Sequence, residues 1–198
     1  WFKGLSKGID AGTKIYGVSG KVNRPGAFEL PMGTTIREIL EQHAGGLKDG
    51  LSLKAFLPGG ASTDFLTADF LDVPMDYSSM AQKRTRMGTG TMIILDDHTC
   101  PIGMMLNLER SFKQESCGFC TPCREGLSFV YETLSAIERG EGLESDLGIL
   151  EKHARLLGPG STFCALAPGA SAPLGTGLKL FREEFLQHIA MKRCPYGN

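Results

Sequence analysis

The 198-residue sequence has no long run of apolar residues and almost no net charge. Its uninterrupted apolar stretches are only a few residues long, as in MIIL at 92–95, whereas a bilayer-spanning helix needs about 20. The formal net charge is −1, from 21 basic and 22 acidic residues, so no overall field attracts nucleic acid or an anionic membrane. We therefore expect a soluble chain with no nucleic-acid partner and no direct membrane insertion.

The sequence also lacks the signals of secretion and of dinucleotide binding. It begins at Trp1, and its first residues have neither the basic start nor the apolar core of a signal peptide. The GTG tripeptides at 88–90 and 175–177 do not continue into GxGxxG, so neither predicts a dinucleotide loop. From the Trp1 start we expect a piece of a longer protein.

Residues with catalytic spacing are missing as well. The sequence has four histidines with no partner at metal-ligand or triad spacing, and each is predicted to be a surface residue or a satisfied polar one: His43, His98, His153 and His188. No catalytic residue is therefore predicted.

Cysteine is the residue type whose pattern carries information. The six cysteines are Cys100, Cys117, Cys120, Cys123, Cys164 and Cys194. Three of them are spaced two residues apart in ESCGFCTPCREG, and no secretory signal precedes them. A metal or cluster site in a reducing compartment fits this pattern better than a disulfide framework.

The CxxCxxC run lets three thiolates converge on one point, and a distant fourth thiolate completes the set that a [4Fe–4S] cluster requires. The run supplies Cys117, Cys120 and Cys123, and Cys164 in STFCALAPG is the candidate fourth ligand. Structural zinc sites also use four cysteines, but usually as two CxxC pairs. The spacing favours the iron–sulfur cluster and leaves zinc as the alternative. Cys100 is predicted to be a packed or partly exposed thiol.

Residues 13 to about 96 read as short strands around one helix. In TKIYGVSGKV, Tyr16 and Val18 alternate with Ile15, Gly17 and Ser19, as on the two faces of a strand. Pro25 with Gly26 predicts a tight hairpin turn. GTTIREILEQHAGG predicts a helix capped by Thr34 or Thr35 and ended by Gly45 and Gly46. LKAFLPGG and TMIILDD predict two more strands. This order indicates a small α+β unit of the β-grasp type.

The hydrophobic period changes to 3.6 from about residue 101 onward. Helices are predicted in PIGMMLNLERSFKQE, in 121–139, in SDLGILEKHARLLG and in PLGTGLKLFREEFLQHIAMK. Four such helices predict a small all-α bundle. The boundary between the two parts is expected near 96–101.

Several of these segments together resemble one family. GVSGKVNRPGAFELPMGTTIREIL, LPGGAST, MGTGTMIILDD, ESCGFCTPCREG and TFCALA look like the C-terminal part of the NADH-binding flavoprotein subunit of NADH:quinone oxidoreductase (complex I). They are also similar to the diaphorase subunits of NAD-linked hydrogenases and formate dehydrogenases. The resemblance extends from about Gly12 to Ile189.

The resemblance implies an SLBB-type β-grasp domain over 12–97 and a four-helix iron–sulfur domain over 98–192. It implies that Cys117, Cys120, Cys123 and Cys164 hold one [4Fe–4S] cluster, and that Ala165 and Leu166 pack near FMN. FMN and NAD(H) would belong to the full-length protein, in an N-terminal domain whose glycine-rich loop is missing here. Cys194 would be a terminal thiol or the first residue of a ferredoxin-like extension.

The function implied is single-electron relay from reduced FMN, through the cluster, within an NADH dehydrogenase-type complex. The implied partners are a thioredoxin-like [2Fe–2S] subunit and further iron–sulfur subunits of a heteromeric complex. The implied location is the cytoplasm or the cytoplasmic face of the inner membrane in bacteria, and the mitochondrial matrix in eukaryotes. The alternative is a ligand-binding or docking module in which four cysteines form a structural zinc site.

Overall fold

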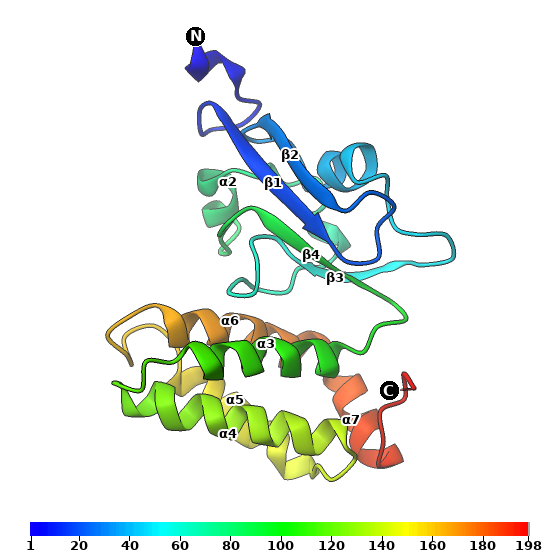
Figure 1. Cartoon of the computed structure of the whole chain (residues 1–198), viewed down its shortest axis with the longest axis vertical. Coiled ribbons are helices and arrows are strands. Elements are labelled where there is room, and N and C mark those ends of the chain that lie inside the picture. Colours follow the sequence, from blue (N-terminus) through cyan, green and yellow to red (C-terminus); the bar gives the residue numbers. More distant parts are fainter. Residues whose placement is uncertain (198) are drawn as a thin grey trace. The chain divides into compact units, whose positions relative to one another are not determined.

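The computed structural model describes residues 1–197 and divides the chain into two compact units. The first unit is Trp1–His98, and the second begins at Thr99 (Figure 1). Within the described part of the chain, no helix is long and apolar enough to cross a membrane.

The first unit contains a four-stranded mixed sheet. Its strands are β1 (Thr13–Ser19), β2 (Gly26–Pro31), β3 (Leu53–Leu57) and β4 (Thr91–Asp96), in the spatial order β2-β1-β4-β3. The two outer pairs, β1 with β2 and β3 with β4, are antiparallel, while the central pair β1 with β4 is parallel. A parallel pair requires a crossover connection, and this one contains a helix. The arrangement confirms the predicted β-grasp type.

The connection from β1 to β2 is longer than the tight turn predicted at Pro25 and Gly26. β1 ends at Ser19 and Gly26 is already the first residue of β2. The chain bends at Gly20 instead, where φ is +111° and a Cβ atom would lie 2.6 Å from the carbonyl oxygen of Ile94. Only glycine fits such a close approach with positive φ, which the Pro-Gly signal did not reveal.

The predicted helix over GTTIREILEQHAGG is present. It consists of α1 (Ile36–Glu38) followed by a π-helical turn over Ile39–His43, and Gly45 and Gly46 follow with φ of +74° each. The unit is completed by α2 (Tyr77–Gln82) and two short 3₁₀ turns, Phe2–Leu5 and Ala68–Phe70.

Thr35 caps α1, since its Oγ1 accepts a hydrogen bond from the Glu38 backbone N–H at 3.2 Å. Thr35→Ala removes this acceptor and is expected to lower the free energy of unfolding by about 1 kcal/mol. Urea denaturation measures the change. The matched control is Thr133→Ala on the surface of the second unit. The Thr133 hydroxyl donates to the Phe129 carbonyl of its own helix. Its loss should change the free energy of unfolding by no more than about 0.5 kcal/mol. Equal losses in both variants would contradict the capping role.

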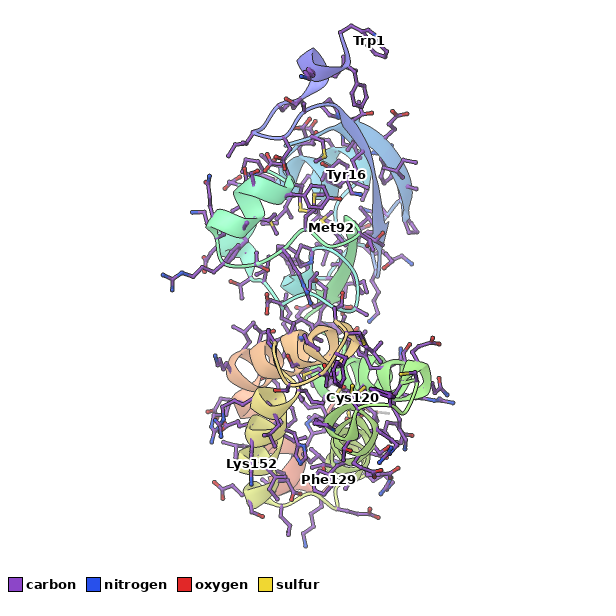
Figure 2. The ribbon with its side chains drawn as sticks, turned by 90° about the vertical axis from the view of Figure 1, so that its left-hand side faces the viewer. Trp1, Tyr16, Met92, Cys120, Phe129 and Lys152 are labelled. Atoms are coloured by element: carbon purple, nitrogen blue, oxygen red, sulfur yellow. The ribbon has the colours of Figure 1, made fainter. Side chains whose placement is uncertain are left out.

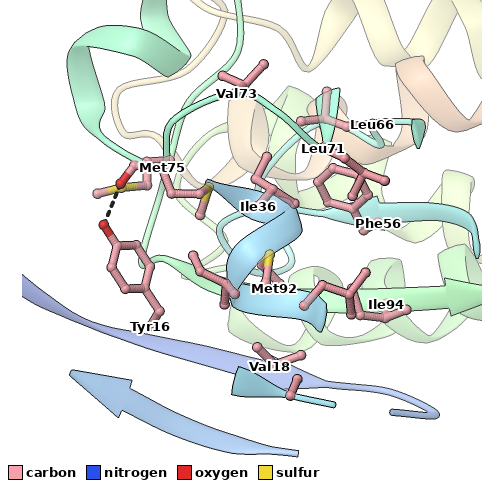
Figure 3. Close-up of a cluster of buried hydrophobic side chains, with 14 of the residues drawn as sticks. Tyr16, Val18, Ile36, Phe56, Leu66, Leu71, Val73, Met75, Met92 and Ile94 are labelled. Carbon is pink, nitrogen blue, oxygen red and sulfur yellow. Dashed lines mark hydrogen bonds between the residues drawn. The ribbon is translucent and has the colours of Figure 1, made fainter. Parts of the chain in front are cut away.

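The core of the first unit lies between the sheet and these helices (Figure 3). Tyr16, Ile36, Phe56 and Met92 are fully buried. The Tyr16 hydroxyl donates a hydrogen bond to the backbone carbonyl of Met75, and burial raises the pKa of Tyr16 to about 12. The apolar alternation of β1 therefore faces this core, as a strand with one buried face requires.

The second unit is all-helical. It consists of α3 (Pro101–Glu115), α4 (Thr121–Glu138), α5 (Glu144–Leu156), α6 (Leu166–Leu180) and α7 (Arg182–Met191) (Figure 1). The apolar face predicted for α4 is buried in full: Leu127, Val130, Leu134 and Ile137. The α+β class with a helical second part is confirmed.

The last predicted helix differs from the structure in two ways. It starts earlier, at Leu166, and it is interrupted at Phe181, so that α6 and α7 are separate helices. The early start was missed because LAPGASAP is rich in proline and glycine, which usually interrupt helices. Here small residues such as Ala167, Gly169 and Ala170 are buried, which lets α6 pack closely against its neighbours.

Candidate metal centre

The CxxCxxC run forms the entry to α4. Cys120 is the residue before the first helical position, Thr121, and Pro122 occupies the first turn (Figure 2). Proline suits this place because its missing N–H would have no partner there. Gly118 has a φ of +79°, so the chain can turn sharply between Cys117 and Cys120. The positive end of the α4 dipole therefore lies beside the three thiols and favours anionic ligands.

The loop that carries Cys164 packs against this entry. The Phe163 backbone N–H donates a hydrogen bond to Cys120 Sγ at 3.5 Å. The rings of Phe119 and Phe163 meet edge to face, with centroids 5.5 Å apart. Because Phe163 precedes Cys164 directly, these contacts place the loop of the fourth cysteine against Cys120. Among the described residues, the ligand atoms of the four thiols do not all lie within 4.8 Å of one another.

The two segments border a shared pocket of about 400 Å³. Its lining comes from both sides: Phe119, Cys120, Thr121, Pro122, Gly160, Ser161, Thr162 and Phe163. The space is therefore built from the start of α4 and the α5–α6 loop together, and sequence separation alone did not indicate it.

Local hydrogen bonds hold the cysteine-bearing backbone. Ser116 Oγ lies 3.3 Å from Cys123 Sγ and also accepts the Gly118 N–H at 3.3 Å. Arg124 Nη1 donates to the Gly118 carbonyl at 2.9 Å, which places a guanidinium charge beside the turn. Thr162 Oγ1 donates to the Cys164 carbonyl at 3.0 Å. These contacts constrain both loops, and the Arg124 charge is itself paired with Glu125, whose Oε1 lies 2.8 Å from Arg124 Nε.

The four thiols differ in exposure. Cys123 is buried, Cys120 is partly exposed, and Cys117 and Cys164 are exposed. Four thiols on two adjoining segments fit the ligand set of a [4Fe–4S] cluster. The N–H that meets one sulfur and the N-terminus of α4 would stabilise the negative charge of such a cluster.

Ala165 and Leu166 lie where α6 begins. Ala165 precedes the helix and is exposed, and Leu166, its first residue, is partly buried. Both follow Cys164 directly, so they border the thiol site. Their packing against a flavin stays a prediction.

One group of ligand-type side chains was missed by the sequence analysis. Cys100, Glu138, His188 and Cys194 place their ligand atoms within 4.8 Å of one another, and three of them are buried. Cys100 is a packed thiol and His188 a buried residue with hydrogen-bond partners, both as predicted, but their grouping with Glu138 and Cys194 was not. The available signal was the HxxxxxC spacing from His188 to Cys194; the other two members are far away in the sequence.

Comparisons with known proteins match a part of each unit. Residues 15–65 match the SLBB domain, and residues 103–188 match the NADH-ubiquinone oxidoreductase-F iron-sulfur binding region. The chain is thus similar to an SLBB domain in its first unit and to an iron–sulfur binding region in its second, and this match supports an electron-transfer role for the helical unit.

Individual relatives extend the match over the whole chain. The F subunit of NADH-quinone oxidoreductase from Escherichia coli is 52% identical over 198 residues, which are 100% of this chain and 44% of that protein. The F 2 subunit of the same oxidoreductase in Rhizobium meliloti is 42% identical, with 99% of this chain and 46% of that protein covered. The resemblance drawn from the motifs is confirmed, and the chain spans less than half the length of these relatives.

A solved structure agrees. The crystal structure of an NAD⁺-reducing [NiFe]-hydrogenase in the H₂-reduced state matches with a TM-score of 0.78 and 25% sequence identity. The match covers 98% of this chain and 32% of the hydrogenase chain. Both units of the fold therefore recur in a chain of an NAD⁺-reducing [NiFe]-hydrogenase.

Proposed function

We propose that this chain is the electron-transfer portion of an NAD(P)H-oxidising flavoprotein subunit of the NADH:quinone oxidoreductase type. Cys117, Cys120, Cys123 and Cys164 hold one [4Fe–4S] cluster. When bound, the cluster accepts and passes on one electron at a time. The observation that carries the proposal is the contact of the Cys164 loop with Cys120, where the Phe163 N–H meets the sulfur.

The residues of the chain have three tasks in this function. The cysteine thiolates bind the cluster, and the Phe163 N–H with the α4 N-terminus stabilises negative charge on the sulfurs. Phe119 and Phe163 form an exposed apolar edge beside Cys120. Ala165 and Leu166 border the site where FMN, held by another part of the full-length protein, would approach.

The proposed partners follow from the same relatives. Those proteins are named as subunits, and we propose that a thioredoxin-like [2Fe–2S] subunit and further iron–sulfur subunits receive the electrons. Phe119 and Phe163 are 75% and 89% exposed, so the thiol site lies at a surface that a partner can reach. NADH oxidation itself requires the FMN domain, because no dinucleotide loop is present in this sequence.

The relay is tested in the full-length protein by adding NADH anaerobically and following the flavin absorbance and the EPR spectrum together. We expect NADH to bleach the flavin and to produce a cluster signal. Cys164→Ser should keep the flavin bleaching and lose the EPR signal, whereas Ser161→Ala in the same loop should keep both. A native protein whose flavin is reduced while the cluster stays oxidised would contradict the relay.

A further inference from the structure

A second set of metal-ligand side chains lies within the helical unit, apart from the four cysteines discussed above. Cys100 directly precedes α3, Glu138 is the last residue of α4, His188 lies in α7 and Cys194 follows α7. Cys100 Sγ is 3.3 Å from His188 Nε2 and 3.4 Å from the Glu138 Oε2 atom. His188 Nε2 is 3.3 Å from the same carboxylate oxygen. Four chain segments therefore meet at one small group of donor atoms.

The side chains are oriented as ligands. His188 Nδ1 lies 2.6 Å from the Glu184 carbonyl oxygen, so this nitrogen carries the proton and donates it. The other ring nitrogen, Nε2, then faces the thiol and the carboxylate. An imidazole held through its other nitrogen by a carbonyl is the usual arrangement of a metal-bound histidine. Cys100 Sγ accepts the Gly103 N–H at 3.2 Å, a contact that stabilises a thiolate.

From these contacts we propose a closed structural Zn²⁺ site formed by Cys100, Glu138, His188 and Cys194. Thiolate, imidazole and carboxylate are the ligand types that zinc binds. A tetrahedral ion with Zn–S bonds of about 2.3 Å separates its two sulfurs by about 3.8 Å, and all four donor atoms here lie within 4.8 Å of one another. Two thiolates and a carboxylate need a cation when buried, and Zn²⁺ leaves a net charge of only −1 on the site.

The backbone around the site is shaped for close approach. A Cβ atom on Gly140 would lie 2.0 Å from the Lys192 carbonyl oxygen, so the chain just after α4 can contact the residue after α7 only through a glycine. Lys192 has a left-handed conformation, with a φ of +51°, and it turns the chain so that Cys194 returns to Glu138. These two features bring the C-terminal segment to the end of α4.

The role of the site is structural, because it lies at the opposite end of α4 from the CxxCxxC run. The 18 residues of α4 span about 27 Å at 1.5 Å per residue, so the two sites share no ligand. Zinc would bind the start of α3, the end of α4 and α7 together and would fix the segment after α7 to the bundle.

Zinc is measured by elemental analysis and zinc K-edge absorption on the anaerobically purified protein. We expect one zinc per chain with two sulfur neighbours at about 2.3 Å and two nitrogen or oxygen neighbours at about 2.0–2.2 Å. This spectrum needs no variant and is independent of the iron, so it stands even if the proposed cluster does not.

Variants identify the ligands. Cys194→Ser and Glu138→Gln should each lower the bound zinc at least tenfold after dialysis against a chelator while iron is retained. His153→Gln, which replaces a half-buried histidine stacked on Phe129 in the same unit, should keep both metals. Cys117→Ser should lose iron and keep zinc. A protein without bound zinc, or with a Cys100–Cys194 disulfide, or with zinc surrounded by four sulfurs, would overturn the proposal.

Discussion

Replacing Cys120 by serine is expected to release the iron–sulfur cluster, with bound iron falling from about four per chain to less than one. Cys120 Sγ is the thiol that accepts the N–H of the Cys164 loop, so the change also weakens the contact between the two segments. Because cluster binding and folding are coupled, the Tm of the helical unit should fall on the order of 10 °C or more. Iron analysis and circular dichroism melting under argon measure both effects.

The control for the iron content is Cys194→Ser, the same loss of a sulfur in the same unit but outside the CxxCxxC pattern; it is no control for the Tm, because Cys194 is proposed above to bind zinc. It should keep the full iron content. If Cys120→Ser kept its iron and its Tm, Cys120 would not be a ligand, and the ligand set drawn from the spacing would be wrong.

Glu109→Gln is expected to stabilise the helical unit at neutral pH. Glu109 lies on the buried face of α3, four residues after Met105, and only 1% of it is exposed. Neither of its carboxylate oxygens has a hydrogen-bond partner among the described residues. Burial raises the pKa of Glu109 from 4.5 to about 8. A carboxyl group in such surroundings is therefore protonated in the folded protein at neutral pH.

The pH dependence follows from the direction of this shift. Between pH 4.5 and 8 the unfolded chain has lost the proton that the folded protein still holds, so the folded state binds more protons and stability falls as pH rises. Below pH 4.5 both states are protonated and the effect vanishes. By pH 7.5 the free energy of unfolding has fallen on the order of 2–4 kcal/mol relative to its value below pH 4.5, at 1.36 kcal/mol per pKa unit.

Urea denaturation measures this fall in the free energy of unfolding. It is carried out on the native protein and on Glu109→Gln at several pH values between 5 and 8. The two proteins should be nearly equal at pH 5, and the variant should be the more stable one at pH 7.5. Glu115→Gln, at the exposed end of the same helix, should leave the pH dependence unchanged. Parallel curves for the native protein and Glu109→Gln would show that Glu109 titrates normally.

Local patterns predicted those parts of the fold that local physics determines. The alternation in TKIYGVSGKV predicted β1 because Tyr16 and Val18 face the core while Ile15 and Ser19 do not. The 3.6-residue stripe of α4 predicted its buried face. The start of α6 was missed because Ala167, Gly169 and Ala170 owe their burial to close helix packing, and a proline-rich segment hides that in sequence.

The two metal-ligand groups show the same limit. The CxxCxxC spacing names three donors from one local segment, so the sequence alone suffices to propose that site, and its ligand set stays a prediction. Cys100, Glu138 and His188 come together only through tertiary packing, across separations of 38 and 88 residues. No local period connects them, and each was assessed singly. The fourth candidate ligand, Cys164, lies between these cases, since the neighbouring Phe163 contacts Cys120 and places the loop, though not the thiol itself, at the entry to α4.

The most direct test of the central claim is the iron and acid-labile sulfide content of the anaerobically purified protein, with EPR spectra before and after dithionite reduction. The account predicts about four iron and four sulfide per chain and an EPR signal that appears on reduction. Two zinc per chain, no sulfide and no signal would contradict it, because zinc would then occupy the four-cysteine site, and a binding module with structural metal sites would be the better description.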